Sequence, residues 1–349
     1  MFIFADCNER IMKSVIIRII IMSVLLCLAV GACKKKETEK EYMTGSVNIE
    51  YDMPHYVMPG ERYVFKASGI TKPDGYDVYY YFSNPATNTK DTLRTAADSY
   101  VFDVPDTLGT FSLSCIAYAN GGTDKYYTSS NYIYFVIVSD DPEHGSISLA
   151  EPWPFEEQVM LYDRNYYVVT AGGKEWLRSN LCYVRRESGE ESFGHSYQGS
   201  PAMQNIFGGF YTWEEAQTAC PDGWHLPSEA EWTALLKQAG APDDLQPMQT
   251  SPVGAGKLMV KATFNGETLW DFYRGVTITD ESISAMPFGY ATLKGGSFEF
   301  QGYTSYAVFW TADEFEGLGV YRYIYKEYDC VYAGTADKRT FAANVRCVR

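Results

Sequence analysis

The sequence predicts a two-domain chain in which an all-β sandwich is followed by an α+β domain. Short segments of alternating apolar and polar residues, separated by turn residues, fill the first part of the chain. Two segments with helical spacing and clear start signals occur in the second part. A polar break separates the two parts, and a chain of 349 residues is long enough for about two domains.

The N-terminus has the organisation of an export signal. Basic residues precede an uninterrupted apolar run at residues 19–30, which is shorter than the roughly 20 residues that cross a bilayer. The string Val30-Gly31-Ala32-Cys33 resembles the lipobox of bacterial lipoproteins. This resemblance implies a signal peptide at residues 1–32 and a diacylglycerol on the sulfur of Cys33. An ordinary signal peptide and an uncleaved anchor helix are the alternatives.

The charge balance bears on the partners of the chain. The full chain has 29 basic and 44 acidic residues, of which residues 1–32 hold three basic and two acidic ones. The remainder therefore has 26 basic against 42 acidic residues, a net charge of −16. Such a charge repels the phosphates of nucleic acid and opposes electrostatic docking on anionic lipid. We expect no nucleic-acid partner, and a membrane link that depends on the covalent lipid.

Residues 33–45 are charged and poor in apolar residues, which predicts a flexible tether. Residues 46–140 predict the sandwich, and the regular spacing of their strands is typical of the immunoglobulin type. Residues 109–114, Gly-Thr-Phe-Ser-Leu-Ser, also resemble a strand motif of PKD-like modules, which commonly act as spacers. A linker follows at residues 141–147. The six predicted strands are residues 46–51, 63–67, 76–82, 99–104, 109–118 and 132–138.

Residues 148–349 predict the α+β domain. Its two helices begin with capping-box patterns, Thr212 with Glu215 and Ser228 with Glu231, each followed by apolar residues at helical spacing. Ahead of them, an Ala-Gly-Gly turn between two alternating segments indicates a hairpin. The predicted strands are residues 166–170 and 174–177 of the hairpin, then 276–279, 297–301, 307–310, 320–325 and 344–348.

Several strings occur in a fixed order from residue 166 to the end of the chain. The most specific is Cys-Pro-Asp-Gly-Trp-His-Leu-Pro at residues 220–227; the others are residues 176–181, 211–216, 286–290, 295–298, 309–311 and 344–348. Together they resemble the Fibrobacter succinogenes major paralogous domain, which occurs in lipid-anchored or secreted proteins of Gram-negative bacteria. The resemblance implies a relative of the C-type-lectin-like fold. It also implies an outer-membrane lipoprotein, on the periplasmic face or at the cell surface.

Five cysteines follow residue 33, and export places them in an oxidising compartment that favours pairing. Cys115 stands alone in the first domain, on one face of a predicted strand, which indicates a buried free thiol. The resemblance to lectin-like domains implies a disulfide between Cys220 and Cys347. It leaves Cys182 and Cys330 as a second pair.

No residue pattern predicts a catalytic, metal or cofactor site. His225 has no cysteine or carboxylate at metal-ligand spacing, which favours a structural histidine in a tight turn. The second domain lacks the calcium-binding strings of sugar-binding lectins, Glu-Pro-Asn, Gln-Pro-Asp and Trp-Asn-Asp. Formylglycine-generating enzymes have a related fold but need a reactive cysteine pair near the C-terminus. One further group remains open as an acidic loop or a cation site: Asp313, Glu314 and Glu316.

These observations predict a non-enzymatic protein that binds a glycan or a surface protein. A lectin-like scaffold places variable loops on a braced core, which suits recognition. The alternatives are a structural subunit of a surface filament or envelope complex and, more remotely, an oxidoreductase of the formylglycine-generating type. We expect the binding face at residues 240–275 and the strands around Trp310. The predicted stacking side chains are Trp270, Tyr273, Tyr303 and Tyr306 together with Trp310.

Overall fold

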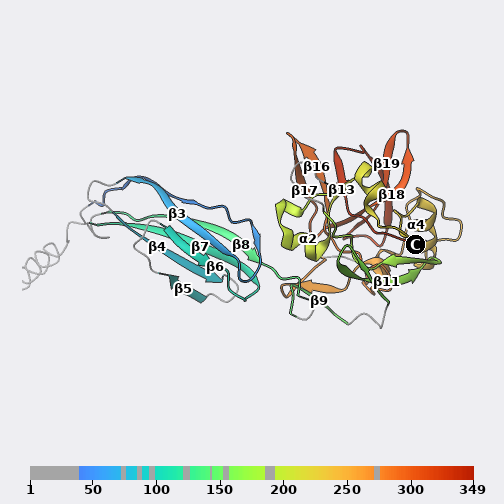
Figure 1. Cartoon of the computed structure of the whole chain (residues 1–349), viewed down its shortest axis with the longest axis horizontal. Coiled ribbons are helices and arrows are strands. Elements are labelled where there is room, and N and C mark those ends of the chain that lie inside the picture. The colour runs from blue at the N-terminus through green and yellow to red at the C-terminus, as the bar shows by residue number, and fades with distance from the viewer. Residues whose placement is uncertain are drawn as a thin grey trace, which may run out of the picture.

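The chain is mostly β-sheet, arranged in an elongated N-terminal part and a rounder C-terminal part (Figure 1). The predicted signal peptide, Cys33, the first residues of the tether and Tyr273 lie outside the residues described. Within the described residues, no helix has the length and apolar character needed to cross a membrane. The computed structural model describes residues 39–71, 76–84, 89–93, 99–120, 126–141, 144–151, 157–184, 193–270 and 276–349.

Two sheets share one hydrophobic core in the N-terminal part. Their strands pair antiparallel, except that β2 runs parallel to β8. All six strands predicted for this part are present, because alternating sequences with regular turns specify strands locally. One sheet has the order β1-β3-β6 (Thr44–Glu50, Arg62–Thr71, Ser99–Asp103) and the other β2-β8-β7-β4-β5 (Tyr56–Val57, Ser129–Ile137, Gly109–Ala119, Tyr76–Asn84, Thr89–Leu93).

Aromatic rings fill the space between these two sheets. Phe82 of β4 stacks on Phe111 of β7 with ring centroids 4.9 Å apart, and Phe102 of β6 meets Phe135 of β8 at 5.6 Å. Cys115 lies in the same core as a buried free thiol, as predicted, and burial raises its pKa to about 11. The pattern of alternate inward residues therefore predicts this core well.

In the described residues of the C-terminal part, the chain forms four small sheets and several short helices. The sheets are β10-β11-β12 (Gln158–Leu161, Arg164–Ala171, Lys174–Leu177), β13-β21-β16-β17 (Tyr211–Thr212, Phe341–Ala343, Tyr290–Lys294, Ser297–Gln301), β15-β14-β9 (Glu267–Thr268, Ala262–Phe264, Ile147–Leu149) and β18-β19-β20 (Tyr306–Phe315, Leu318–Tyr325, Val331–Ala336). The helices are the 3-10 turn η1 (Tyr197–Gly199), α2 (Pro201–Phe207), α3 (Trp213–Ala219), α4 (Glu229–Gln238) and α5 (Ala255–Leu258).

Both predicted capping boxes are confirmed. The Glu215 carboxylate accepts the Thr212 backbone N–H at 2.7 Å, and the Glu231 carboxylate accepts that of Ser228 at 2.8 Å. In return each cap hydroxyl accepts a backbone N–H from the first turn of its helix. Trp232 and its helical neighbours then lie buried against the core on one face of α4.

Two predicted strands are wrong. Residues 276–279 do alternate between buried and exposed, but no neighbouring strand pairs with them in the described structure. Residues 344–348 run between sheets and make single bridges instead of a ladder, such as Phe309 with Asn344 and His225 with Val348. Alternation alone cannot reveal whether a partner strand is in register.

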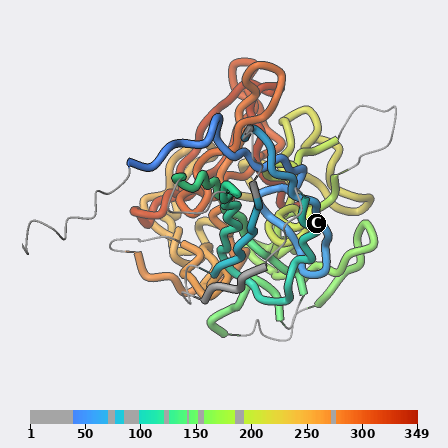
Figure 2. The backbone as a smooth tube through the Cα atoms, turned by 90° about the vertical axis from the view of Figure 1, so that its left-hand side faces the viewer, coloured from blue at the N-terminus to red at the C-terminus, as the bar shows by residue number. Residues whose placement is uncertain are grey.

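The two parts meet through a small set of specific contacts. Tyr56 of β2 packs edge-on against Tyr197 of η1 with ring centroids 5.8 Å apart, and the Ser200 hydroxyl donates to the Tyr56 carbonyl at 3.4 Å. On the other side of the joint, the Asn265 amide donates to the Ile137 carbonyl at 3.1 Å. Figure 2 looks along the long axis and shows the narrower N-terminal part in front of the C-terminal part.

Candidate functional site

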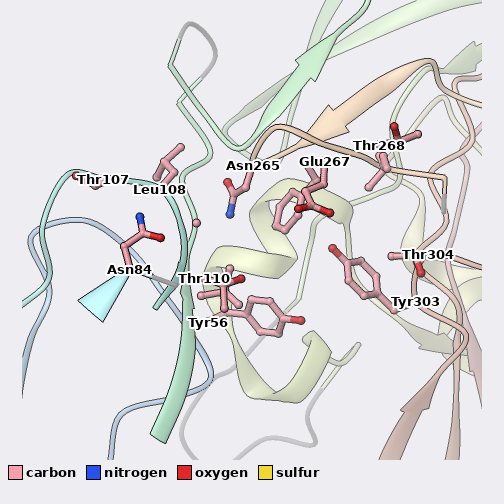
Figure 3. A pocket seen from close by; sticks show the side chains of 14 residues that line it. Tyr56, Asn84, Thr107, Leu108, Thr110, Asn265, Glu267, Thr268, Tyr303 and Thr304 are labelled. Carbon is pink, nitrogen blue, oxygen red and sulfur yellow. The ribbon is translucent and has the colours of Figure 1, made fainter. Parts of the chain in front are cut away.

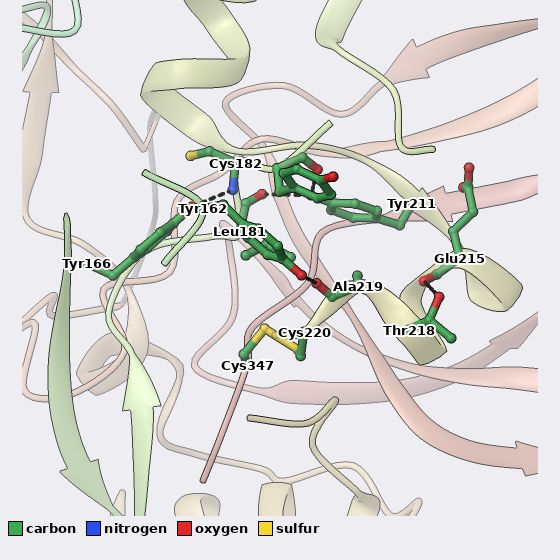
Figure 4. The surroundings of a disulfide bond; sticks show 11 residues. Tyr162, Tyr166, Leu181, Cys182, Tyr211, Glu215, Thr218, Ala219, Cys220 and Cys347 are labelled. Atoms are coloured by element: carbon green, nitrogen blue, oxygen red, sulfur yellow. Dashed lines mark hydrogen bonds between the residues drawn. A yellow bond between two sulfur atoms is a disulfide. The ribbon is translucent and has the colours of Figure 1, made fainter. Parts of the chain in front are cut away.

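A disulfide joins Cys220, at the end of α3, to Cys347 in the final segment, with a Cα–Cα distance of 5.7 Å (Figure 4). This confirms the pair implied by the resemblance. The second predicted pair is wrong, because Cys182 and Cys330 are both free. The Cys182 thiol lies among the carbonyls of Asn180 and Asn205, whereas the Cys330 thiol lies 3.5 Å from the Pro252 carbonyl.

Trp270 and Trp310 are not exposed platforms, which contradicts their predicted stacking role. Their side chains are 1% and 0% exposed. The Trp270 indole donates to the Ala285 carbonyl at 3.1 Å, and the Trp310 indole donates to the Tyr211 carbonyl at 2.7 Å. Both indoles are core groups with a satisfied N–H. The predicted binding segment, residues 240–275, also contains α5 and several buried apolar residues. Much of its described part therefore packs into the core.

The sheet β18-β19-β20 places a row of tyrosines on one of its faces. Along β19, Tyr321, Tyr323 and Tyr325 are half-buried, and they alternate with fully buried Val320, Arg322 and Ile324. The register sets Tyr306 of β18 opposite Tyr325 and Tyr332 of β20 opposite Tyr323, so these rings share that side. We name the following set the tyrosine face: Tyr290, Tyr306, Tyr321, Tyr323, Tyr325, Tyr328, Tyr332 and Phe341.

Ring contacts run without interruption across the tyrosine face. Tyr323 stacks on Tyr332, and Tyr306 on Tyr325, each with centroids 4.8 Å apart. Tyr321 stacks on Phe341 at 5.1 Å and lies 5.8 Å from Tyr323. Each ring is therefore held in place by its neighbours, and the array is formed before any partner arrives.

Four hydroxyls of this face, those of Tyr306, Tyr321, Tyr323 and Tyr332, stay protonated at neutral pH. Burial raises the pKa of Tyr306, Tyr321 and Tyr323. Burial also raises the pKa of Tyr332, to about 12, with a hydrogen bond to Cys330 as the next cause. Each phenol can therefore donate as well as accept a hydrogen bond while its ring offers an apolar surface.

The acidic residues after Trp310 do not converge. The Asp313 carboxylate accepts the Glu229 backbone N–H at 2.7 Å, and Glu314 pairs with Lys338. Glu316 is exposed at the turn between β18 and β19. Among the residues that the structure describes, no three metal-ligating side chains form a group. This arrangement fits an acidic loop better than a cation site.

His225 has a structural environment. Its Nε2 lies 2.9 Å from a Glu231 carboxylate oxygen, and Lys174 Nζ lies 3.3 Å from the same oxygen. The His225 backbone bridges Val348. The side chain and the backbone of His225 together thus join the start of α4 to the end of the chain.

Tyr303, the remaining described candidate, lies in a cleft between the two parts of the molecule (Figure 3). The opposite wall carries Tyr56, Asn84 and Thr107, which were not predicted as site residues. No sequence signal relates these residues to Tyr303, because only the packing of the two parts brings them together.

These features define a β-rich protein with a disulfide-bonded C-terminal part and an aromatic surface. Residues 169–349 match the family model of the Fibrobacter succinogenes major domain, and the chain therefore belongs to this family. The family is a paralogous, surface-associated family of bacteria. No curated protein matches the chain. The matched residues include the disulfide and the whole tyrosine face.

Proposed function

We propose that this chain is a lipid-anchored protein of the Gram-negative outer membrane, on the periplasmic face or at the cell surface, that recognises a glycan or a surface protein. The observation that best supports recognition is the tyrosine face, a continuous array of aromatic rings on the domain that defines the family. The N-terminal lipobox at Cys33 supports the anchor.

Tyrosine side chains combine two properties that suit the recognition of a sugar. A tyrosine ring offers an apolar surface and a polar tip, and it loses little conformational entropy when it is already packed. A sugar ring has the matching properties, with an apolar C–H face and hydroxyls at its rim. The net charge of −15 favours a neutral partner over an acidic one.

The finer architecture belongs to the same proposal. We propose an immunoglobulin-like N-terminal module, which the two sheets around one core support. We also propose a lectin-like C-terminal module, supported by the disulfide between the end of α3 and the final segment. Such a scaffold would hold the recognition surface away from the membrane.

A non-catalytic role is also part of the proposal. Formylglycine-type chemistry would need Cys330 and Cys347 as a reactive pair. Cys347 is bonded to Cys220, and this leaves Cys330 without that partner. The excess of negative charge likewise supports the absence of a nucleic-acid partner.

The test uses the mature chain, exported so that the disulfide forms, on a glycan array and on bacterial and host cell surfaces. We expect binding that the double substitution Tyr323→Ser with Tyr332→Ser reduces at least tenfold. Tyr132→Ser is the matched control, because Tyr132 is a 61% exposed tyrosine of β8, outside the family domain. If no glycan or cell surface bound by the wild type loses binding in the folded double variant, the tyrosine face is excluded as a recognition surface.

A role in assembly is the second candidate, and the edge strand β20 favours it. β20 pairs with β19 on one side, and among the described residues only a bridge from Ser251 to Val331 covers its other side. Unpaired backbone groups at an edge allow another chain to add a strand. Concentration-dependent association in sedimentation, abolished by Thr335→Pro, would support this alternative.

A further inference from the structure

The cleft at the joint has the size of a small-molecule site. Its volume is about 790 Å³, within the roughly 300–1,000 Å³ usual for ligand pockets. One wall comes from the N-terminal part: Tyr56, Asn84, Val136 and residues 107–110. The other wall comes from the C-terminal part: residues 264, 265, 267–269, 303 and 304. Neither part forms the cleft alone (Figure 3).

The cleft contains polar atoms whose hydrogen-bonding capacity is unused. Within the described structure, the hydroxyls of Tyr56 and Tyr303 make no hydrogen bond, and Asn265 Oδ1 is buried without a partner. Of these three atoms, Asn265 Oδ1 is shut off from solvent, whereas the two phenol hydroxyls remain accessible. A polar atom that a bound ligand covers is costly to leave without a partner, so a ligand that fills this cleft must offer hydrogen bonds to the two phenol hydroxyls.

The electrostatics of the lining restrict the ligand. Among the described residues that line the cleft there is no lysine, arginine or histidine, and Glu267 is the one charged residue of that set. Glu267 has no ion-pair partner among the described residues. Burial raises the pKa of both Tyr56 and Tyr303, so their hydroxyls remain neutral donors. In the described lining, an anionic ligand would meet a carboxylate and no compensating cation.

The remaining lining is amphipathic. Rings and aliphatic groups come from Tyr303, Phe264, Leu108 and Val136, and threonines 107, 110, 268 and 304 contribute hydroxyl-bearing side chains to the same lining. A purely apolar ligand would cover the phenol hydroxyls of Tyr56 and Tyr303 and leave them unsatisfied. A ligand with both C–H faces and many hydroxyls satisfies the whole lining.

The two walls are also held in position. The Asn265 amide reaches across to the Ile137 carbonyl, and Asn265 N–H donates to the Ser146 carbonyl at 2.8 Å. Tyr56 is fixed from the C-terminal side by its ring contact with Tyr197 and by the Ser200 hydroxyl. Because the cleft is already formed, little conformational entropy is lost in ordering its walls when a ligand binds.

We propose that the cleft between the two parts binds a neutral saccharide, two to four sugar units long, with Tyr303 and Tyr56 as its central contacts. This site is separate from the tyrosine face, and it requires both parts of the chain. The N-terminal part then acts as one wall of a binding site in addition to carrying the C-terminal part.

The experiment is isothermal titration of the full mature chain with neutral oligosaccharides: cellotriose, xylotriose, maltotriose, mannotriose and chitotriose. Trigalacturonate and palmitate serve as the acidic and apolar probes. We expect binding of at least one neutral trisaccharide and of neither other probe. Tyr303→Ala should weaken that binding at least tenfold, and Tyr303→Phe, which keeps the ring, should weaken it less.

Blocking variants test the composite nature of the site without disturbing its core. Thr107 and Thr268 are exposed residues on opposite walls, so Thr107→Trp and Thr268→Trp should each abolish binding in a chain that still melts normally. Ser130→Trp, at an exposed position of β8 outside the cleft, is the matched control.

Three results would overturn the proposal. One is the absence of binding to every neutral trisaccharide. Another is binding that persists in both tryptophan variants. The third is binding of trigalacturonate or palmitate that the tryptophan variants abolish, since the cleft would then serve a different ligand class.

Discussion

Glu229 and Arg322 form an ion pair that joins α4 to β19 inside the C-terminal core. Their side chains are 2% and 0% exposed. Arg322 Nε donates to one Glu229 oxygen at 2.9 Å and its terminal nitrogen donates to the other, while a further guanidinium N–H reaches the Gln249 carbonyl at 2.6 Å. The Met248 backbone N–H donates to Glu229 as well. Such a pair is stable only while every group has its partner.

Removal of one partner should therefore be severe. We expect Glu229→Ala to lower the free energy of unfolding by about 3–5 kcal/mol, because it leaves the Arg322 charge buried and unpaired. The double variant Glu229→Met with Arg322→Met should recover much of that loss, since it removes both charges. Urea unfolding of the two variants measures the difference, and a double variant less stable than Glu229→Ala would contradict this account.

Glu231 makes the stability of the folded chain depend on pH. Burial acts to raise its pKa, but hydrogen bonds from Ser228 and His225 outweigh burial and lower the pKa to about 2. Because the folded pKa is depressed, its stabilising effect is complete above about pH 4.5 and is lost as the pH falls toward 2. We expect a difference in urea midpoint between the wild type and Glu231→Gln at pH 5, where the Glu231 carboxylate is ionised. It should then shrink toward pH 2.5, and a constant difference throughout would refute the assignment.

At the scale of elements, sequence patterns predicted the strands, turns and helix starts that depend on residues close together in the sequence. The six N-terminal strands, the hairpin of β11 and β12, and both capping boxes follow from alternation, turn residues and cap chemistry within a few residues of each other. The failures concern distant partners. Whether Cys182 lies near Cys330, or whether residues 276–279 find a neighbouring strand, depends on how segments far apart in the sequence are packed.

The candidate site was predictable to a similar extent. Tyr306 and the strands near Trp310 do belong to an aromatic surface, because aromatic residues at alternate positions share a face of a strand. Trp310 itself points into the interior, since the same sheet face is covered near one end by β13 and β21. The cleft could not be found in this way, because half of its lining belongs to the N-terminal part.

The disulfide fixes the end of α3 to the end of the chain, and its loss should destabilise the C-terminal part most. The two cysteines are 127 residues apart, and closing a loop of this length corresponds to about 5 kcal/mol in the chain-entropy model. We expect the double variant Cys220→Ser with Cys347→Ser to have a lower free energy of unfolding than the wild type, by a large share of this amount, when both are unfolded in urea. Cys182→Ser with Cys330→Ser is the control, which should leave no comparable loop-closure effect. Equal losses in both variants would argue against the observed pairing.

At the scale of the whole molecule, the two parts have separate cores and a narrow joint. The N-terminal core contains Phe65, Leu113 and Phe135, whereas Tyr56 and Val138 at the joint pack with the core of the C-terminal part. Limited contact of this kind allows each part to unfold as its own cooperative unit. The joint therefore orients the two parts, and positions the cleft, without merging their cores.

This organisation predicts two transitions in scanning calorimetry. Leu113→Ala, at a fully buried N-terminal site, should cost about 2–5 kcal/mol and shift only the transition of the N-terminal part. Reduction of the disulfide with dithiothreitol should shift only the other transition, because both cysteines lie in the C-terminal part. A single transition that responds to both treatments would mean that the joint couples the two cores. In that case a ligand in the cleft would stabilise the entire chain. If there are two transitions, a ligand should raise mainly the midpoint temperature of the lower one, because unfolding of either part destroys the site.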